Sequence, residues 1–322
     1  MNLYPLKFKP ILKERLWGGT KLKDLFGKPS TSEITGESWE LSAVTGDVSI
    51  VSNGELEGTF LQDLIDKYPV ELLGKSVVDR FGTEFPILIK FIDAKQDLSI
   101  QVHPNDALAK ERHNSFGKTE MWYIMDADPG AQLVVGFNRD VSKTEYWQSL
   151  QNDTLLELLH YEKVHEGDTF FINTGKIHAI GAGVLLAEIQ QTSDITYRVF
   201  DFNRKDKEGN LRELHTELAL DAIDYKKKDD FKVAYSKEMN SLNTMVDCPY
   251  FKTNILELDK NFSIDTNNRD SFTIYMCVDG RALIENEFGK VSIQKGETTL
   301  IPAMSQIISI NTEGAKLLEV TI

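Results

Sequence analysis

Short segments rich in β-branched and aromatic residues, separated by turns rich in Gly, Asp and Asn, make up most of this chain. The clearest of them predict strands at residues 87–92, 98–102, 120–125, 132–136, 169–173, 184–190 and 196–201. Helical periodicity is confined to residues 59–73, 104–113, 142–159 and 214–223. Many short strands with a few inserted helices predict a mainly β fold, either a sandwich or a jelly roll.

One strand and its preceding turn occur twice in similar form. Residues 165–173 align without gaps on residues 294–302, and each copy has a turn with Gly and an acid, an apolar strand and a turn residue. The second copy resembles cupin jelly rolls in its Gly-x₅-Pro spacing from Gly296 to Pro302, and Asn173 takes the proline position in the first copy. We therefore predict two cupin-like jelly-roll units.

The two copies differ in residues that can bind a metal. His178 follows the first copy at the position where the second has Ile307. Upstream, Glu120 aligns with Phe272. Only the first unit is therefore predicted to bind metal.

The boundary between the units is predicted near a charged run at residues 226–230, which reads as a solvated linker. Residues 1–235 form the predicted catalytic metal-binding unit with helical insertions. Residues 236–322 form the predicted second cupin-like β unit without ligands.

Composition excludes several classes of function. The 36 basic and 50 acidic residues give a net charge of −14, so nucleic acid and anionic membranes are poor partners. The N-terminus lacks the apolar core of a signal peptide, and no apolar run is long enough to span a membrane. The 2 cysteines form no C-x-x-C pair, so a disulfide framework or a thiolate metal site is not expected. We expect a cytoplasmic protein.

Four side chains form the candidate metal site. Gln101 and His103 stand two apart in a strand-like run, so they leave the same face. Glu120 opens a neighbouring strand, and His178 is placed at the end of another. Each of these alone is more often an ordinary polar residue. Together, two imidazoles, a carboxylate and an amide oxygen make a first shell for a divalent metal such as zinc, with a position left for water or substrate.

Two further candidates lie two residues from a ligand. Lys118 precedes Glu120 by two positions and is expected to lie beside the metal, where it would move a proton or hold a sugar or phosphate oxygen. Ser99 stands in the same relation to Gln101 and is a candidate phosphate or hydroxyl contact. The alternative for such a lysine is simple solvation.

Two charged residues interrupt apolar strands. Lys90 and Glu188 are each surrounded in sequence by Ile, Leu, Phe or Ala, where charge is rarely placed. Lys90 is expected either to reach an edge or to point into a polar cavity. A partly desolvated Glu188 would have a raised pKa and could act as a general base, and its alternative is a hydrogen-bonded structural acid.

Several motifs in this order resemble type I mannose-6-phosphate isomerase, in its short bacterial form. They are Leu-Trp-Gly-Gly-Thr at 16–20, Ser-Ile-Gln-Val-His-Pro at 99–104, Gly-Lys-Thr-Glu-Met-Trp-Tyr at 117–123, Ile-His-Ala-Ile-Gly at 177–181 and Ser-Asp-Ile-Thr-Tyr-Arg at 193–198. The resemblance implies a cupin enzyme with one Zn²⁺ per chain that interconverts mannose 6-phosphate and fructose 6-phosphate through an enediolate. The implied partner is a small sugar phosphate, and we expect a monomer or weak homodimer.

Carried over residue by residue, the resemblance makes Gln101, His103, Glu120 and His178 the zinc ligands. Arg198 falls on the active-site arginine of the family. A guanidinium suits the enediolate or the phosphate, and its alternative is a structural ion pair with Asp194 or Asp201.

The proton carrier and the role of the N-terminal motif stay open in the sequence. Glu188 is the candidate base, with Lys118 or a zinc-bound water as competitors. Trp17 is a candidate substrate contact on a glycine loop, or part of a turn packed under a tryptophan.

Two other functions compete with the isomerase. One is a different metal-dependent cupin enzyme such as an iron oxygenase, although an amide ligand at Gln101 suits a Lewis-acid metal better. The other is a non-catalytic sugar-binding bicupin.

Overall fold

Two sheets form the N-terminal two thirds of the protein, whose computed structural model describes residues 2–206 and 208–322. The six-stranded sheet has the order β1 (Ile11–Gly19), β2 (Thr35–Leu41), β5 (Ile87–Ala94), β12 (Val184–Gln191), β7 (Glu120–Ala127) and β10 (Thr169–Ile172). The five-stranded sheet has the order β13 (Tyr197–Phe200), β6 (Ile100–Val102), β11 (His178–Ile180), β8 (Gln132–Phe137) and β9 (Leu159–Lys163). Apolar side chains of both sheets, such as Ile92, Ile124, Leu133 and Ile180, form one cluster. The sheets therefore pack face to face as a sandwich.

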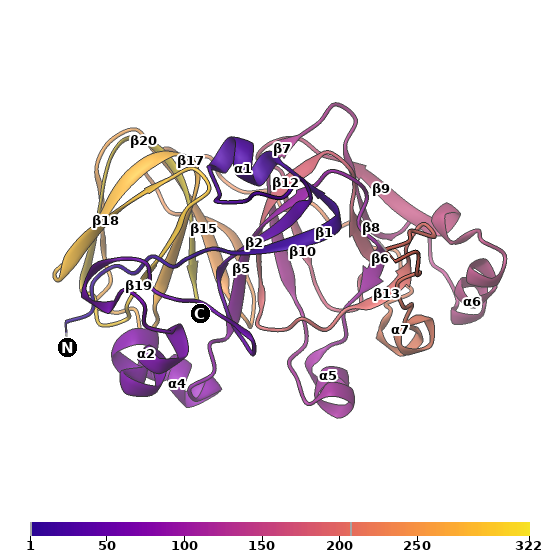
Figure 1. Ribbon diagram of the computed structural model, residues 1–322, viewed down its shortest axis with the longest axis horizontal. Coiled ribbons are helices and arrows are strands. Elements are labelled where there is room, and N and C mark those ends of the chain that lie inside the picture. The colour runs from indigo at the N-terminus through magenta and orange to yellow at the C-terminus, as the bar shows by residue number, and fades with distance from the viewer. Residues whose placement is uncertain (1, 207) are drawn as a thin grey trace.

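A third sheet takes all its strands from the C-terminal part of the chain and lies at the left of Figure 1. Its order is β14 (Asn243–Asp247), β15 (Lys252–Leu258), β20 (Ile307–Thr321), β17 (Thr273–Asn286) and β18 (Gly289–Gln294), with β16 (Phe262–Asp265) on β20 and β19 (Thr298–Ile301) on β17. A small hairpin, β3 (Ala43–Val44) with β4 (Asp47–Val48), stands apart. The mainly β fold is thus confirmed.

The six-stranded sheet is covered on both faces. Every residue of β5 and of β12 is buried. The odd-numbered residues of these strands, such as Phe91 and Ile189, pack against Ile274 and Leu318 of the C-terminal sheet. The even-numbered ones face the sandwich interior. This double cover explains the almost continuous apolar runs of β5 and β12, and it places Lys90 inside the sandwich rather than at an edge.

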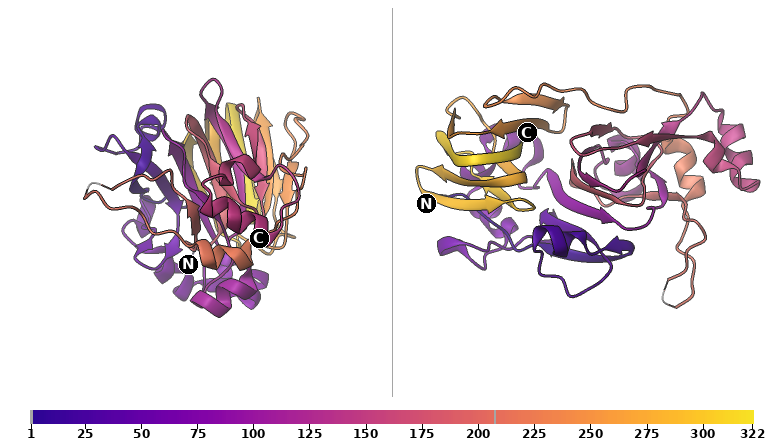
Figure 2. Two further views of the ribbon diagram at one scale, coloured as in Figure 1. Left: turned by 90° about the vertical axis from the view of Figure 1, so that its right-hand side faces the viewer. Right: turned by 90° about the horizontal axis from the view of Figure 1, so that it is seen from above.

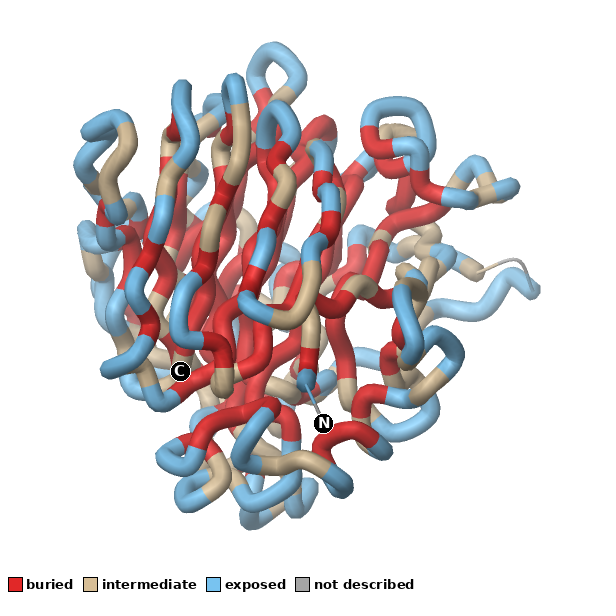
Figure 3. Tube along the Cα trace, turned by 90° about the vertical axis from the view of Figure 1, so that its left-hand side faces the viewer, coloured by how far each residue is buried: buried red, intermediate tan, exposed pale blue. Residues whose placement is uncertain are grey.

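The N-terminal segment ties the C-terminal sheet to the rest. Leu6 bridges to Leu300, and Leu3 belongs to the same apolar cluster as the C-terminal strands. Figure 3 shows the buried middle of the strands and the exposed turns that join them. Within residues 2–206 and 208–322, no helix has the length and hydropathy that a bilayer crossing needs.

The helices are short and lie outside the sheets. They are α1 (Lys21–Phe26), α2 (Leu61–Lys67), α3 (Pro69–Leu73), α4 (Lys75–Phe81), α5 (Asp106–His113), α6 (Lys143–Gln151) and α7 (Thr216–Ala222), with 3₁₀ turns at Gly54–Leu56 and Leu155–Leu158. The helix predicted at 59–73 is divided at Pro69, which lacks the amide hydrogen that would continue α2. Helix α5 begins later than predicted, because Asn105 caps it by accepting from the Leu108 amide at 2.9 Å.

The helix predicted at 142–159 is wrong in its second half. Helix α6 ends at Gln151, and Asp153 takes a left-handed conformation with φ 56°. The leucines that follow form a 3₁₀ turn and then enter β9. Leucine spacing alone does not separate a buried helix from a turn leading into a strand.

The aligned segments occupy matching places, but with a one-residue correction. Strand β10 pairs with β7 so that Ile172 faces Glu120, and β19 pairs with β17 so that Ile301 faces Thr273. Thr273, and not Phe272 as predicted, therefore stands at the place of Glu120. The predicted alignment matched Tyr123 with Tyr275, which shifts the strand by one residue and exchanges its two faces. Matching registers support the prediction of two jelly-roll units.

Candidate active site and metal centre

A cavity of about 300 Å³ lies between the two sheets of the sandwich. It is lined by Trp17, Lys90, Ser99, Gln101, Lys118, Glu188 and Arg198. All of these are sequence-predicted site residues, and they come from segments far apart in the chain. The structure therefore brings the predicted substrate and catalytic residues together.

Three predicted metal ligands converge beside this cavity. The Nε2 atom of His103 lies 3.4 Å from Glu120 Oε1, and Nε2 of His178 lies 3.7 Å from Glu120 Oε2. One ligand atom from each of the three residues falls within 4.8 Å of the others. Glu120 comes from the six-stranded sheet, and His178 from the facing one. His178 begins β11 rather than ending a strand.

Main-chain carbonyls fix the tautomer of both histidines. His103 Nδ1 lies 2.9 Å from the Ile195 carbonyl oxygen, and His178 Nδ1 lies 2.8 Å from that of Lys176. Each Nδ1 therefore carries the hydrogen and donates it, which leaves the lone pair of Nε2 directed at Glu120.

The cluster fits a divalent metal. In the described part of the chain, His103 Nε2 and Glu120 Oε2 are buried with no hydrogen-bond partner, whereas Glu120 Oε1 has the Lys118 ammonium beside it. Buried polar atoms without partners are costly, and a cation between His103 Nε2 and Glu120 Oε2 would satisfy both. Two imidazole nitrogens and a carboxylate are ligands that zinc prefers.

Protonation in the cluster also favours a metal. Burial, followed by the proximity of the His103 ring, lowers the pKa of His178 to about 3. Burial and then the charge of Lys118 lower the pKa of His103 as well. Burial by itself would raise the pKa of Glu120, but Lys118 and the histidines outweigh it and hold that pKa well below its ordinary value. The cluster thus holds two neutral imidazoles and one carboxylate near neutral pH.

Gln101 completes the predicted ligand set. Its Nε2 atom lies 3.3 Å from His178 Nε2. The two ends of an amide are nearly isosteric, so a half-turn of the side chain brings Oε1 to the same place. Gln101 is thus within reach of the position between the histidines.

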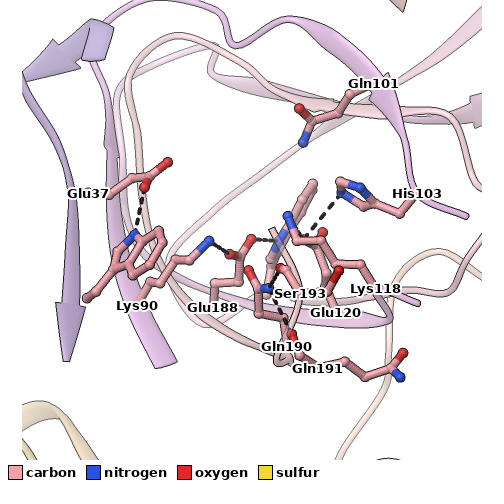
Figure 4. A network of polar contacts seen from close by, with 12 residues as sticks. Glu37, Lys90, Gln101, His103, Lys118, Glu120, Glu188, Gln190, Gln191 and Ser193 are labelled. Carbon is pink, nitrogen blue, oxygen red and sulfur yellow. Dashed lines mark hydrogen bonds and ion pairs between the residues drawn. The ribbon is translucent and has the colours of Figure 1, made fainter. Parts of the chain in front are cut away.

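Glu188 lies on β12, in the cavity wall formed by the six-stranded sheet, and belongs to the polar network seen in Figure 4. Its Oε2 accepts a hydrogen bond of 2.9 Å from the Trp122 indole, and its Oε1 lies 3.1 Å from Lys90 Nζ. Burial, followed by the charge of Glu120, raises the pKa of Glu188 in spite of Lys90 and Lys118. A carboxyl with a raised pKa beside a cavity is suited to proton transfer.

The C-terminal sheet repeats this network at matching ladder positions. Glu319 pairs with Tyr275 and with Asn254, just as Glu188 pairs with Trp122 and Lys90. Glu319 accepts from the Tyr275 hydroxyl at 3.0 Å and from the Asn254 amide at 2.8 Å. Arg269 contributes the positive charge there, 2.9 Å from Glu319.

Lys118 lies between the metal cluster and Glu188. It precedes β7 rather than belonging to the strand, yet its Nζ lies 2.9 Å from Glu120 Oε1. Burial by itself would lower the pKa of Lys118, but the carboxylates of Glu120 and Glu188 outweigh it and raise that pKa. A bound divalent cation would act in the opposite direction.

Arg198 reaches the cavity from β13, directly opposite Gln101 in the ladder. The predicted alternative, an ion pair with Asp194 or Asp201, is wrong for the described residues. Its guanidinium donates to the Glu213 carbonyl oxygen at 2.9 Å, and its Nε is buried without an acceptor in the described part of the chain.

The tryptophan motif is part of a strand and not of a loop. Trp17 is buried in β1 and lines the cavity. A Cβ on Gly36 would lie 2.6 Å from Trp17 Cζ3, so the glycine lets β1 and β2 approach closely. Ser99 is also buried at the cavity.

Sequence reasoning missed several residues of the cavity wall. They include Arg15, Glu37, Trp39, Asp194 and Arg212. The alternation of Glu37 and Trp39 could have revealed β2 and its polar face. Arg212 carries no local signal, because a long excursion of the chain brings it back to the site.

Known proteins share this sequence and fold. Residues 5–148 match the family described as phosphomannose isomerase type I, catalytic domain, and residues 241–319 match the mannose-6-phosphate isomerase cupin domain. The chain is 38% identical to mannose-6-phosphate isomerase ManA of Bacillus subtilis over 94% of both proteins. It is 34% identical to mannose-6-phosphate isomerase of Streptococcus mutans over 92% of both.

A solved structure gives the same result. The crystal structure of the mannose 6-phosphate isomerase from Bacillus subtilis has a TM-score of 0.90 and 33% identity, covering 99% of this chain and 100% of that one. Since the relatedness runs along nearly the whole of both sequences, this chain belongs to the type I phosphomannose isomerase family.

Proposed function

We propose that this protein is a zinc-dependent mannose-6-phosphate isomerase, which interconverts mannose 6-phosphate and fructose 6-phosphate. The buried cluster of His103, Glu120 and His178 beside a cavity lined by lysine, arginine and glutamate carries the proposal. The names of the related proteins supply the substrate.

Gln101, His103, Glu120 and His178 would hold the metal. When bound there, a divalent ion supplies Lewis-acid polarisation of the carbonyl and hydroxyl oxygens of the sugar. The remaining steps belong to the side chains around the cavity.

Glu188 is the proposed proton carrier. The isomerisation moves one proton from C2 to C1 and one hydroxyl proton from O2 to O1 through an enediolate, and it needs no second reactant. Glu188 Oε1 would take the C2 proton and return it to C1, while Trp122 holds Oε2 and fixes the carboxyl plane. Lys118 competes for this role, and its ammonium is otherwise placed to move the hydroxyl proton of the sugar.

Arg198, Lys90, Ser99 and Trp17 are proposed to bind the substrate. Arg198 presents a permanent positive charge to the enediolate or the phosphate. Lys90 lies beside Glu188 and over the Trp39 ring at 5.1 Å, so its ammonium has a fixed position in the wall. Trp17 and Ser99 contribute an apolar surface and a hydroxyl.

Solvent exchange tests the role of Glu188. In deuterated water, E188Q is expected to lose deuterium incorporation at C2 of mannose 6-phosphate while it retains metal. E37Q is the matched control, because Glu37 lines the same cavity but lies against Arg15 and Trp39. Exchange that persists in E188Q would transfer the role to one of the two competitors, Lys118 or a zinc-bound water.

A coupled assay for fructose 6-phosphate, together with metal analysis of protein purified without added metal, tests the whole proposal. One zinc per chain and turnover support the isomerase. Stoichiometric iron with oxygen consumption would favour the oxygenase, and full zinc occupancy without turnover would favour a sugar-binding bicupin. R198A is expected to retain metal and lose turnover.

We also propose a cytoplasmic monomer or weak homodimer with a first unit at 1–235 and a second at 236–322. Composition supports the location, and the third sheet supports the boundary because its strands all lie within residues 243–321. Sedimentation and cell fractionation test the first two statements.

A further inference from the structure

A chain excursion after β13 returns a second arginine to the cavity. Arg198 lies on β13. The right-hand view in Figure 2 shows the chain leaving the body of the protein as a long loop after this strand. It comes back at Arg212, and both arginines line the same cavity. Two guanidinium groups thus reach one site from segments on either side of the excursion.

Asp201 sets the orientation of Arg212. Arg212 Nε donates to Asp201 Oδ2 at 2.6 Å, and Arg212 Nη2 donates to Oδ1. The Asp201 carboxylate is only 5% exposed, so this fork is held from within the protein. The same carboxylate also accepts from Arg204 Nη2 at 2.5 Å. Arg212 Nη1 has no acceptor in the described part of the chain and is left for another group.

Positive charge is in excess at this end of the cavity, because Arg198, Arg204 and Arg212 stand against two carboxylates, those of Asp201 and of the wall residue Asp194. The other cations of the wall each have a carboxylate, since Arg15 pairs with Glu37, Lys90 with Glu188 and Lys118 with Glu120.

At the excursion, by contrast, Asp201 serves two arginines, and Arg198 has only a main-chain carbonyl. Burial, followed by the charge of Arg212, lowers the pKa of Arg198. Neighbouring guanidinium groups with spare donors form a site for an anion that can accept several hydrogen bonds.

We propose that Arg212, held by Asp201, forms a two-arginine clamp with Arg198 that binds the phosphate group of the substrate. Arg212 is thus a specificity-determining residue for phosphorylated over free sugar. The identity of the sugar rests on the proposed function, whereas the phosphate site itself rests on the geometry of the two arginines.

Kinetics and phosphate binding of R212Q test the clamp. In the zinc-loaded full chain, R212Q is expected to raise KM for mannose 6-phosphate about tenfold or more, with kcat within about twofold, because a ground-state contact is lost. The inhibition constant of inorganic phosphate should rise by a similar factor. R212K keeps the charge without the fork and should fall between R212Q and the parent.

R204Q is the matched control. Arg204 shares Asp201 and the excursion with Arg212, but it does not line the cavity. It is expected to change both constants by less than about twofold. Unchanged constants in R212Q would overturn the clamp. Equal changes in R212Q and R204Q would also overturn it, because Asp201 and its arginines would then only stabilise the excursion.

Calorimetry with inorganic phosphate separates this inference from the proposed function. If the parent binds phosphate and R212Q binds it about tenfold more weakly, the clamp stands even where mannose 6-phosphate is not turned over. If the parent binds no phosphate, the clamp is wrong even where turnover is measured.

Discussion

At the scale of single residues, the metal cluster is set by hydrogen bonds that do not involve the metal. The Nδ1 bonds of His103 and His178 to carbonyl oxygens choose the tautomer, and burial keeps both rings neutral. Both imidazoles are thereby ready to ligate before any ion is present. The sequence predicted the candidate ligands His103 and His178, but not these carbonyls, because Ile195 and Lys176 offer only main-chain atoms.

Removing a ligand is expected to remove metal and turnover together. Loss of a group that only hydrogen-bonds to a metal ligand lowers metal affinity roughly tenfold to hundredfold. H103A and E120A remove a ligand itself, so they should lower zinc affinity by more than this. Zinc titration with a competing chelator measures this. H160A is the control, since His160 lies on β9 and pairs with Glu162 outside the cluster. Zinc affinity that is unchanged in H103A would refute the site.

Glu37 is expected to make stability depend on pH. Burial by itself would raise the pKa of Glu37, but Lys90 and Arg15 outweigh it and lower that pKa to about 2 from 4.5. Since the pKa is lower in the folded state, the contribution is present above pH 4.5 and is lost as pH falls toward 2. It amounts to at most about 3–4 kcal/mol at about 1.4 kcal/mol per pH unit.

Urea unfolding between pH 3 and 6 checks this on the parent and E37Q. The free energy of unfolding should fall more steeply with acid in the parent. Parallel curves would show that Glu37 does not carry the dependence.

At the scale of elements, close approach of β1 and β2 builds one wall of the cavity. A methyl group at Gly36 would meet Trp17 Cζ3 at 2.6 Å and Arg15 Cβ at 2.7 Å. The strand pair therefore depends on the absence of a side chain at this position, and Trp17 keeps its place because of it.

G36A is therefore expected to destabilise the protein by about 1–3 kcal/mol and to raise KM as Trp17 moves. G314A is the control, because a Cβ there meets nothing within 4 Å. Thermal unfolding and kinetics of both variants measure the effect. Equal shifts in the two variants would mean that backbone entropy, and not the contact, is responsible.

Elements also show how far sequence reasoning extends. The strands that carry Gln101, Glu120 and Glu188 were predictable, because β-branched residues and alternation mark them locally. Phe272 was placed one residue wrong, since register is set by pairing with β19 and not by local pattern. Arg212 could not be predicted. It reaches the cavity wall because the loop after β13 folds back, and no pattern in the sequence indicates this path.

At the scale of the whole molecule, the six-stranded sheet contributes to two hydrophobic cores, one on each of its faces. The six-stranded sheet faces the cavity on one side and the C-terminal sheet on the other. Leu3 and Leu6 of the N-terminal segment pack with the C-terminal strands as well. The two predicted units are thus joined by apolar packing rather than only by a linker.

We therefore expect the full chain to unfold in one cooperative transition. A fragment of residues 1–235 should bind a hydrophobic dye and lose its near-ultraviolet circular dichroism, because it exposes the face that holds Phe91 and Ile189. Calorimetry of the full chain and spectroscopy of the fragment test this. Two separate transitions, or a well-packed fragment, would contradict it.

Glu188 and Glu319 stand at matching ladder positions of two sheets, so Glu319 can serve as an internal control for Glu188. A survey of substitutions that scores cellular abundance and catalytic activity separately should distinguish them. Changes at Glu319, which is bound by Tyr275 and Asn254, should lower abundance, and activity should fall only in proportion. Changes at Glu188 should lower activity by more than abundance explains. The same ladder position would thus stabilise the fold in the C-terminal sheet, through Glu319, and serve catalysis in the six-stranded sheet, through Glu188.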